Sequence, residues 1–174
     1  KGEIAAASAV DDIKENLPFW LLGLDSDGGS EFINWHMVRY CEKKKLFFTR
    51  SRPNRKNDNA YVEQKNNTHI RQLLGYDRFD APEKVEAIND LYRNELRLFN
   101  NFFKPVMKIL SKEKINNSVC RKKYDTPKTP YQRLIESGQL PDGQAERLTA
   151  LYKTLNPVQL KKTINEKVRK IKKM

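Results

Sequence analysis

The chain has 174 residues, with 34 Lys and Arg against 22 Asp and Glu, which gives a formal net charge of +12. This length suits one domain, or one domain with an appendage. The longest strongly apolar run, PFWLLGL at 18–24, is far too short to cross a bilayer. Composition therefore excludes a membrane-spanning protein and predicts a polyanion, most commonly nucleic acid, as the partner.

The beginning of the chain and its two cysteines bear on where the protein works. Residues 1–10 (KGEIAAASAV) lack the charged leader and long apolar run of a secretory signal. Cys41 and Cys120 have no CxxC partner, so we expect both to be reduced thiols in a cytosolic protein. The first residue is Lys1 and the first Met is Met37, so we expect the tail of a longer reading frame.

The first half of the chain has the pattern of a strand, a helix and a second strand, preceded by the end of a helix at 10–16. The apolar run at 18–25 ends in DSDGG and predicts a buried, parallel-type strand. Ser30 can cap a helix over 31–44, on which Ile33, Met37 and Tyr40 share one face. A short strand follows at 46–49. This order predicts a βαβ unit with its ligand site at the carboxyl ends of the strands.

A basic loop follows at 43–57, KKKLFFTRSRPNRKN, which holds seven basic residues and no acid. It favours phosphate contacts, although a solvated face is the other interpretation. A helix then begins at Asn57 or Asp58 and ends with Gly75 as its cap.

The second half is mainly helical in pattern. Asp80 is expected to cap a helix with Pro82 in its first turn and Glu83 completing a capping box. The apolar spacing continues to Leu110 with a kink at Pro105.

The remaining segments follow in order. Residues 111–130 are polar and basic and read as a linker, and short helices are predicted at 130–137 and 142–154. Asn156-Pro157 opens a last helix with an apolar stripe and basic other faces, which can hold DNA or pack on a partner helix. We expect the core to contain Trp20, Trp35 and the Phe and Tyr residues of 92–103.

Two carboxylates stand out as candidate ligands. Asp27 follows the first strand in a tight Asp-Gly-Gly turn, and Glu63 lies in a helix after 35 intervening residues. The path between them returns to the same sheet edge, where both can converge on a divalent cation, and Mg²⁺ takes such oxygen ligands. Asp25 is the alternative candidate for the metal ligand, but it is better explained as the residue that ends the strand. His36 and His69 have no Cys at zinc spacing and are read as packing or surface residues.

These residues resemble the catalytic core shared by retroviral integrases and bacterial DDE transposases. That family has a D-N-G-x-x-F element, 35 residues, and a Glu in a helix; the chain reads DGGSEF from Asp27 and then Glu63. The stretch NAYVEQKN around Glu63 is similar to integrase-type transposases of insertion sequences. The resemblance covers residues 1–75 as a partial catalytic core. Residues 76–174 resemble the helical, basic C-terminal extension of the same transposases, on weaker motifs such as YDTPKTPYQRLIESG.

The chain departs from the family pattern in two ways. Gly28 replaces the usual Asn, which should loosen the active-site turn. The first Asp of the triad is missing, since Asp11 and Asp12 lie too close to Asp27 and in a helical segment. The resemblance therefore implies an α/β, RNase H-like fold without its first strands.

The resemblance implies phosphodiester cleavage and strand transfer in a parent enzyme, with this chain alone inactive. It implies two Mg²⁺ (or Mn²⁺) ions, with Asp27 and Glu63 as the ligands present here. It further implies DNA as partner, a homo-oligomer, no membrane, and a bacterial cytoplasmic location on the nucleoid. The DNA contacts expected are Arg50, Arg52, Arg55, Lys56, Lys65 and Asn66. Two alternatives stay open: a non-catalytic DNA-binding or oligomerisation fragment, and an RNase H-like nuclease that acts without transfer.

Overall fold

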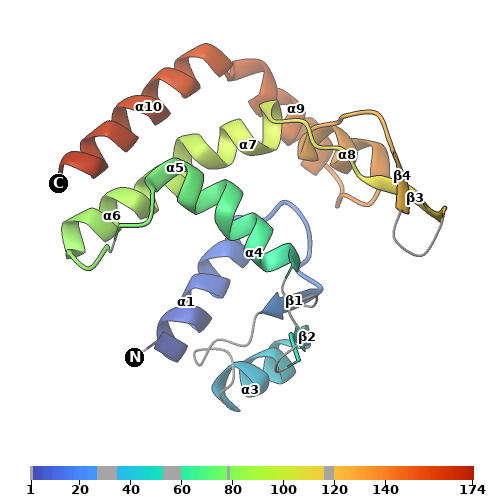
Figure 1. Ribbon diagram of the computed structural model, residues 1–174, viewed down its shortest axis with the longest axis horizontal. Coiled ribbons are helices and arrows are strands. Elements are labelled where there is room, and N and C mark those ends of the chain that lie inside the picture. The colour runs from blue at the N-terminus through green and yellow to red at the C-terminus, as the bar shows by residue number, and fades with distance from the viewer. Residues whose placement is uncertain (1, 27–34, 53–59, 78, 116–119) are drawn as a thin grey trace. The chain divides into compact units, whose positions relative to one another are not determined.

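A computed structural model of the chain describes residues 2–26, 35–52, 60–77, 79–115 and 120–174. The chain divides into two compact units, Lys1–Asp77 (unit 1) and Arg78–Met174 (unit 2), which Figure 1 colours from blue to green and from green to red. Both units combine helices with a small two-stranded sheet, as a mixed α/β protein should.

Unit 1 begins with the expected strand, helix and strand, preceded by a helix. The elements are α1 (Gly2–Glu15), β1 (Gly23–Ser26), α3 (Trp35–Lys44) and β2 (Phe47–Arg50). β1 and β2 pair in parallel, with Gly23 opposite Phe47 and Ser26 opposite Arg50. The predicted βαβ order is therefore confirmed. Ser30 and Ile33, expected at the start of the helix, lie outside the described residues.

The core of unit 1 is small and lies between α3 and the two strands. Its buried members are Met37 and Cys41, each 1% exposed, and Leu46. Met37 was expected on the inner face of this helix, and Cys41 follows it by one helical turn. Burial raises the pKa of the Cys41 thiol. Partly buried side chains from α1, from α3, and from the strands and the residues before them complete the cluster: Ala6, Ala7, Leu21, Leu24, Tyr40 and Phe48.

The strand expected at 18–25 is wrong over its first half. Pairing with β2 begins only where the Phe47 N–H donates to the Leu22 carbonyl over 2.9 Å, and no described strand pairs with the residues before this point. Trp20 is 77% exposed and Leu22 79%, which also contradicts the expectation that Trp20 is a core residue. The side chain of Trp35 lies outside the described residues.

One further helix completes unit 1. It consists of α4 (Ala60–Asn66), a π-helical turn η2 (Asn67–Arg71) and α5 (Gln72–Leu74). The Thr68 hydroxyl donates to the carbonyl of Gln64 over 2.9 Å at the start of the π turn. Gly75 ends the helix at φ 95°, a conformation that favours glycine, so its predicted role as cap is confirmed.

Unit 2 opens with a long helix that is interrupted by a second π turn. Its parts are α6 (Pro82–Leu91), η3 (Tyr92–Leu96) and α7 (Arg97–Phe103). Two expectations are corrected here. The N-cap is Ala81, with no side-chain cap, rather than Asp80, because Pro82 itself occupies the first helical position. The helix ends at Phe103 instead of kinking at Pro105, because Lys104 is extended, as residues before proline prefer to be.

The last helix packs on this long helix. α10 (Pro157–Lys173) is capped by Asn156, whose side chain accepts from two backbone N–H groups, and it contacts α6, η3 and α7. Ile164 and Ile171 of its apolar stripe are each 1% exposed. The apolar stripe of α10 is therefore buried against the long helix of unit 2 itself. Packing on another helix was one of the two roles expected for α10, and the helix it packs on belongs to the same unit. Lys167 on the same helix binds Asp90 Oδ2 at 2.6 Å and Glu95 Oε2 at 2.7 Å.

Two shorter helices lie between these elements, α8 (Pro130–Ser137) and α9 (Gln144–Thr154), as predicted. Their aromatic residues pack on α7 and on each other: the ring centroid of Tyr131 on α8 lies 5.0 Å from that of Phe102 on α7 and 5.1 Å from that of Tyr152 on α9. Phe102 is buried, so the expectation that the aromatic residues of 92–103 contribute to the core is confirmed for this residue.

The expected linker at 111–130 instead contains an antiparallel pair of strands. β3 (Ile109–Lys114) and β4 (Cys120–Tyr124) form what we call the ribbon. Neither strand buries a face, so the apolar and polar alternation that normally reveals a strand is missing from its sequence. Cys120 in this ribbon is an exposed free thiol, and Cys41 is a buried one.

Within the described residues, each helix is too short or too polar to cross a lipid bilayer.

Candidate functional site

The candidate site lies at the carboxyl ends of the two parallel strands of unit 1. Parallel strands bring their carboxyl ends to the same edge, which is where ligands bind in open α/β sheets. β1 ends at Ser26 and β2 at Arg50, and these two residues are opposite each other in the register. Asp27 is the next residue in the sequence after Ser26, and it lies outside the described residues.

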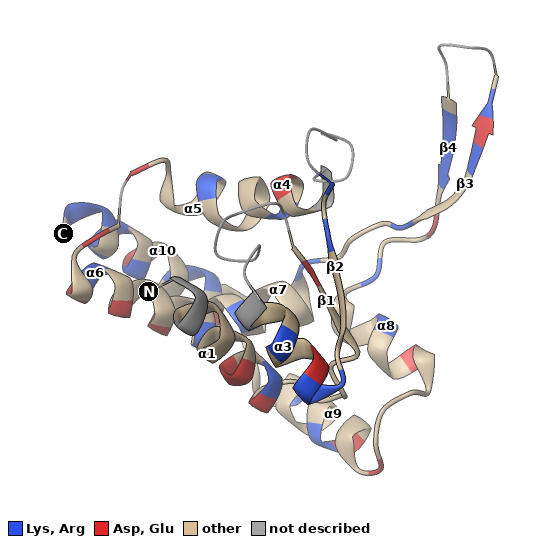
Figure 2. Cartoon of the chain, turned by 90° about the horizontal axis from the view of Figure 1, so that it is seen from below, with Lys and Arg blue, Asp and Glu red and all other residues tan. Residues whose placement is uncertain are grey.

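Glu63 lies on the helix that follows β2 along the chain. It belongs to α4, and its side chain is exposed. Figure 2 shows α4 following β2 after a short grey trace. Val62, the residue before it, is half-buried, as expected for a helix that is partly packed. Glu63 is therefore a carboxylate that is open to solvent on an ordered helix.

The helix geometry separates the two residues expected to contact DNA next to Glu63. Asn66 is three positions after Glu63, so the two lie on the same face of α4. Lys65 is two positions after Glu63 and lies on a different side. Both side chains are exposed. Asn66 is thus the better placed of the pair to share a ligand with Glu63.

Arg50 and Arg52 are the described members of the basic loop that were expected to contact DNA, and both are exposed. The loop expected at 43–57 is wrong in part, because α3 runs to Lys44 and β2 covers Phe47–Arg50. Arg50 is therefore the last residue of β2, at the same edge as Ser26. Arg55 and Lys56, also expected to contact DNA, lie outside the described residues, as does Gly28.

A buried hydroxyl lies at the same edge. Ser26 is 6% exposed, and its Oγ has no hydrogen-bond partner among the described residues. Its carbonyl is satisfied, since it accepts from the Ser51 N–H at 3.0 Å. An unpaired buried hydroxyl is costly in a native structure. The strand end beside Asp27 therefore has an unused polar group.

Asp25 has a partner that explains its position. The Thr49 hydroxyl donates to Asp25 Oδ1 over 2.7 Å, and the two residues are opposite each other in β1 and β2. Asp25 thus forms a cross-strand pair before the strand ends. Asp11 is also occupied, because the Tyr40 hydroxyl donates to its Oδ1 over 2.7 Å.

A metal ion needs several ligating side chains that lie close together. The part of the chain that the structure describes contains no group of three or more His, Cys, Asp or Glu side chains that could hold a metal. Glu63 supplies one carboxylate, and the second candidate ligand, Asp27, is not described. The described residues alone therefore do not make a metal site.

The sequence analysis noted that residues 111–130 are basic but missed that they form paired strands, because the segment reads as a linker. The signal available was the cluster of cations in SKEK and CRKKY with a single acid, Glu113. The buried hydroxyl of Ser26 had no signal in the sequence.

Comparisons with known proteins give one relative. The uncharacterized protein y4rM of Sinorhizobium fredii is 40% identical to the chain over 126 residues, which make up 72% of this chain and 35% of y4rM. The chain therefore spans about a third of the length of this relative. No protein-family model matches the chain, and no solved structure matches it.

Proposed function

We propose that the chain is part of a DNA transposase of the integrase type, whose parent enzyme cuts phosphodiesters and joins the freed 3′ end to target DNA. The observation that carries the proposal is the parallel pairing of β1 with β2 around α3, followed by the helix that bears Glu63. The same order of elements is expected for the last two strands of an RNase H-like sheet. Asp27 would then follow the strand end at which such enzymes bind their metal.

Mg²⁺ would supply the charge that stabilises the attacking and leaving oxygens of a phosphodiester. In the proposed enzyme Asp27 and Glu63 would each give it carboxylate oxygens, and the third carboxylate would come from outside these residues. The exposure of Glu63 supports this role, because Mg²⁺ keeps several waters and binds where phosphate can reach it. The unpaired hydroxyl of Ser26 supports an edge that is completed by further groups.

The DNA partner of this site would be held by Arg50, Arg52, Arg55, Lys56 and Asn66, with Lys65 on the neighbouring face of α4. If these residues neutralise Z phosphates, log K falls with log salt at a slope of about −0.9Z. Replacing Arg50, Arg52 and Lys56 by Gln should make this slope shallower. An affinity for DNA that does not change during a salt titration would contradict this part of the proposal.

The test of the metal site is Mn²⁺ binding by the whole chain, followed by electron paramagnetic resonance of free Mn²⁺. We expect weak binding that is lost in Asp27→Asn and in Glu63→Gln. Asp25→Asn is the matched control, because Asp25 is engaged by Thr49 and should not bind the ion. Equal binding by all three variants and the original chain would refute the assignment of Asp27 and Glu63.

The second candidate is a DNA-binding or oligomerisation fragment without catalysis. It is favoured by one observation, the net charge of +12, which predicts a polyanion partner whether or not the chain is catalytic. The coding sequence upstream of Lys1 separates the two, because an Asp at the end of a strand there would complete the triad. A strand-joining assay on such a longer protein separates a transposase from a nuclease that only cleaves.

A further inference from the structure

The ribbon has an unusual composition for a pair of strands. β3 and β4 hold five basic residues and one acid, and every residue of both strands is exposed. An isolated two-stranded hairpin is only marginally stable in water, and this one buries neither face. Figure 2 shows the ribbon extending from α8 with cations along both strands. Its cations are therefore displayed to solvent on both sides.

The register sorts these cations onto two faces. Residues opposite each other share a face, and neighbours along a strand alternate. Lys112 lies opposite Lys122, and Lys114 lies opposite Cys120, so one face holds three lysines and no acid. We call it the lysine face. The other face pairs Glu113 with Arg121 and Ser111 with Lys123.

The pair of Lys112 and Lys122 is electrostatically unfavourable in the free chain. Like charges directly opposite each other destabilise an antiparallel pair. Within the described part of the chain, neither lysine forms an ion pair. A bound anion would remove this repulsion, so the arrangement favours a ligand with closely spaced negative charges.

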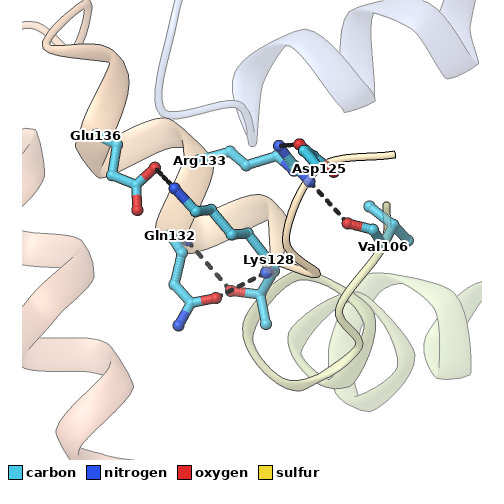
Figure 3. Close-up of polar contacts among 7 residues, drawn as sticks. Val106, Asp125, Lys128, Gln132, Arg133 and Glu136 are labelled. Atoms are coloured by element: carbon cyan, nitrogen blue, oxygen red, sulfur yellow. Dashed lines mark hydrogen bonds and ion pairs between the residues drawn. The ribbon is translucent and has the colours of Figure 1, made fainter. Parts of the chain in front are cut away.

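The base of the ribbon is fixed to α8 by a polar network, drawn in Figure 3. Arg133 on α8 donates to Asp125 Oδ2 at 2.6 Å and to the Val106 carbonyl at 2.8 Å. Asp125 Oδ1 accepts from the Lys108 N–H at 2.7 Å. Both strands are thereby held at the point where they leave the helices. The Arg133 and Asp125 side chains are only 18% and 19% exposed, so the network is shielded from competing water.

The same base is tied to the helical body. Val106 and Lys128 exchange backbone hydrogen bonds of 3.0 and 3.2 Å, and Thr129 then caps α8 in a capping box with Gln132. Tyr131 in the first turn of α8 packs on Phe102 of α7. The ribbon is thus presented from a rigid support, which reduces the entropy lost when it binds.

We propose that the ribbon is a DNA-binding arm that enters the major groove of duplex DNA with its lysine face toward the phosphates. A two-stranded ribbon fits the width of that groove, and lysine is a phosphate ligand. An anionic membrane fits less well, because the exposed apolar residues of the described strands, Ile109, Leu110 and Tyr124, lie at the base of the ribbon beside the helices, and the rest of both strands is polar apart from Cys120. The inference rests on the proposed function only for the choice of DNA as the polyanion, and it shares no residue with the Asp27 and Glu63 site.

The test is fluorescence anisotropy of a labelled 25-base-pair DNA duplex with the whole chain, without divalent metal, over a salt series. The variant Lys112→Gln/Lys122→Gln should lose affinity, and its slope of log K against log salt should be shallower by about 1.8, which is 0.9 for each phosphate contact. The matched control, Arg147→Gln/Lys153→Gln, removes two exposed cations from α9 and should leave the slope nearly unchanged.

The single variant Lys122→Glu guards against loss of binding by unfolding. It places a carboxylate opposite Lys112, so the ribbon should become more stable while DNA binding falls. Thermal unfolding followed by circular dichroism measures the first effect. A duplex RNA of equal length should bind less tightly and lose less affinity in the ribbon variant, because its major groove is too narrow for a ribbon.

Three results would overturn the inference. The first is an equal loss of DNA affinity in the ribbon variant and in the α9 control, and the second is an unchanged DNA affinity in the ribbon variant. The third is a loss of affinity for duplex RNA in the ribbon variant that equals or exceeds its loss for DNA. The DNA-binding assay contains no divalent metal, so its result does not depend on whether the Asp27 and Glu63 site binds Mn²⁺ or supports strand joining. A chain that binds DNA through the ribbon but never binds Mn²⁺ would refute the proposed catalytic site and support the ribbon.

Discussion

Tyr40 on α3 donates its phenolic hydrogen to Asp11 Oδ1 on α1 over 2.7 Å, and this bond ties the first helix to the βαβ unit. Lys44 adds a contact of 3.6 Å to the same carboxylate oxygen. Asp11 is thereby engaged in holding α1 against α3.

This bond predicts an unusual titration. Burial of Tyr40, with the Asp11 carboxylate as its partner, raises the pKa of Tyr40 from 10.0 to about 12. The folded state therefore holds the phenolic proton where the unfolded state has lost it, so the stabilisation is present below pH 10 and is lost between pH 10 and 12. An NMR titration of the Tyr40 Cζ carbon checks the value. Asp11→Asn should lower this pKa only partly, because burial is the larger cause. A midpoint at pH 10 in the original chain would contradict the prediction.

The hydrogen bond between Tyr40 and Asp11 also affects stability at low pH, through the Asp11 carboxylate. The hydrogen bond from Tyr40 lowers the pKa of Asp11 below 3.8, so its contribution is present above that pH and is lost as pH falls through the lowered value. Tyr40→Phe should raise the pKa of Asp11 measured by NMR. An unchanged Asp11 titration in this variant would show that the bond is not formed in solution.

Gly23 is required by the close approach of β1 and β2. A Cβ at this position would lie 2.7 Å from the Phe47 carbonyl oxygen and 3.1 Å from Phe47 Cβ. Gly23→Ala should therefore destabilise unit 1 by about 1–3 kcal/mol, since the clashing oxygen belongs to the backbone of the paired strand. Urea unfolding followed by circular dichroism measures the loss. The adjacent Leu22→Ala, at a side chain that is 79% exposed, should change stability by no more than about 0.5 kcal/mol. Equal effects of the two substitutions would be evidence against the described register.

Because the Ser26 hydroxyl is unpaired, we predict that removing it does not lower the free energy of unfolding. Removing it in Ser26→Ala should leave the free energy of unfolding unchanged or raise it by up to about 1 kcal/mol, because a buried hydroxyl without a partner is a liability. Ser51→Ala serves as control, since the Ser51 hydroxyl donates to the Ser26 carbonyl over 3.4 Å and its loss should cost up to about 1 kcal/mol. A larger loss in Ser26→Ala than in Ser51→Ala would mean that the Ser26 hydroxyl has a partner.

The packing of α10 on the long helix of unit 2 can be tested in the same way. Ile164→Ala should destabilise unit 2 by about 2–5 kcal/mol, because the side chain is 1% exposed and its removal leaves a cavity. Val158→Ala on the same helix, at 77% exposure, should change stability by no more than about 0.5 kcal/mol. If Ile164→Ala behaved like Val158→Ala, α10 would not be docked in solution.

The whole chain should not cleave DNA by itself. Incubation with Mg²⁺ or Mn²⁺ and a labelled duplex should leave the DNA intact, because the proposed chemistry needs three carboxylates and only Asp27 and Glu63 are present. Gel electrophoresis of the labelled strand checks this. Metal-dependent nicking that disappears in Asp27→Ala and in Glu63→Ala would show that the chain is active on its own.

The elements that were predicted correctly are those whose signals are local. Met37 marks the inner face of α3 by helical spacing, and Asn156-Pro157 marks the start of α10 by capping chemistry. The errors arise where the structure of a segment depends on another segment that pairs with it or packs on it. Trp20 and Leu22 form an apolar run that reads as a buried strand, but β2 pairs only from Leu22 onward.

The candidate site was predictable only in part for the same reason. The spacing of Asp27 and Glu63 and the parallel order of the strands could be read from the sequence. The cross-strand bond between Thr49 and Asp25 and the unpaired hydroxyl of Ser26 depend on register and burial, which no single residue encodes. The ribbon was missed because residues 111–114 and 121–123 of its strands are polar on both faces, so only pairing identifies them.

The π turn η3 changes how unit 2 can accommodate a change in chain length. Asp90 and Glu95 are five positions apart, and in a regular α-helix they would point about 140° apart. A π turn brings positions five apart onto one side, and both carboxylates bind Lys167. A helix with one residue fewer between them would reach the same lysine by ordinary α-helical spacing. The turn thus absorbs a one-residue insertion locally, and the docking of α10 is preserved across it.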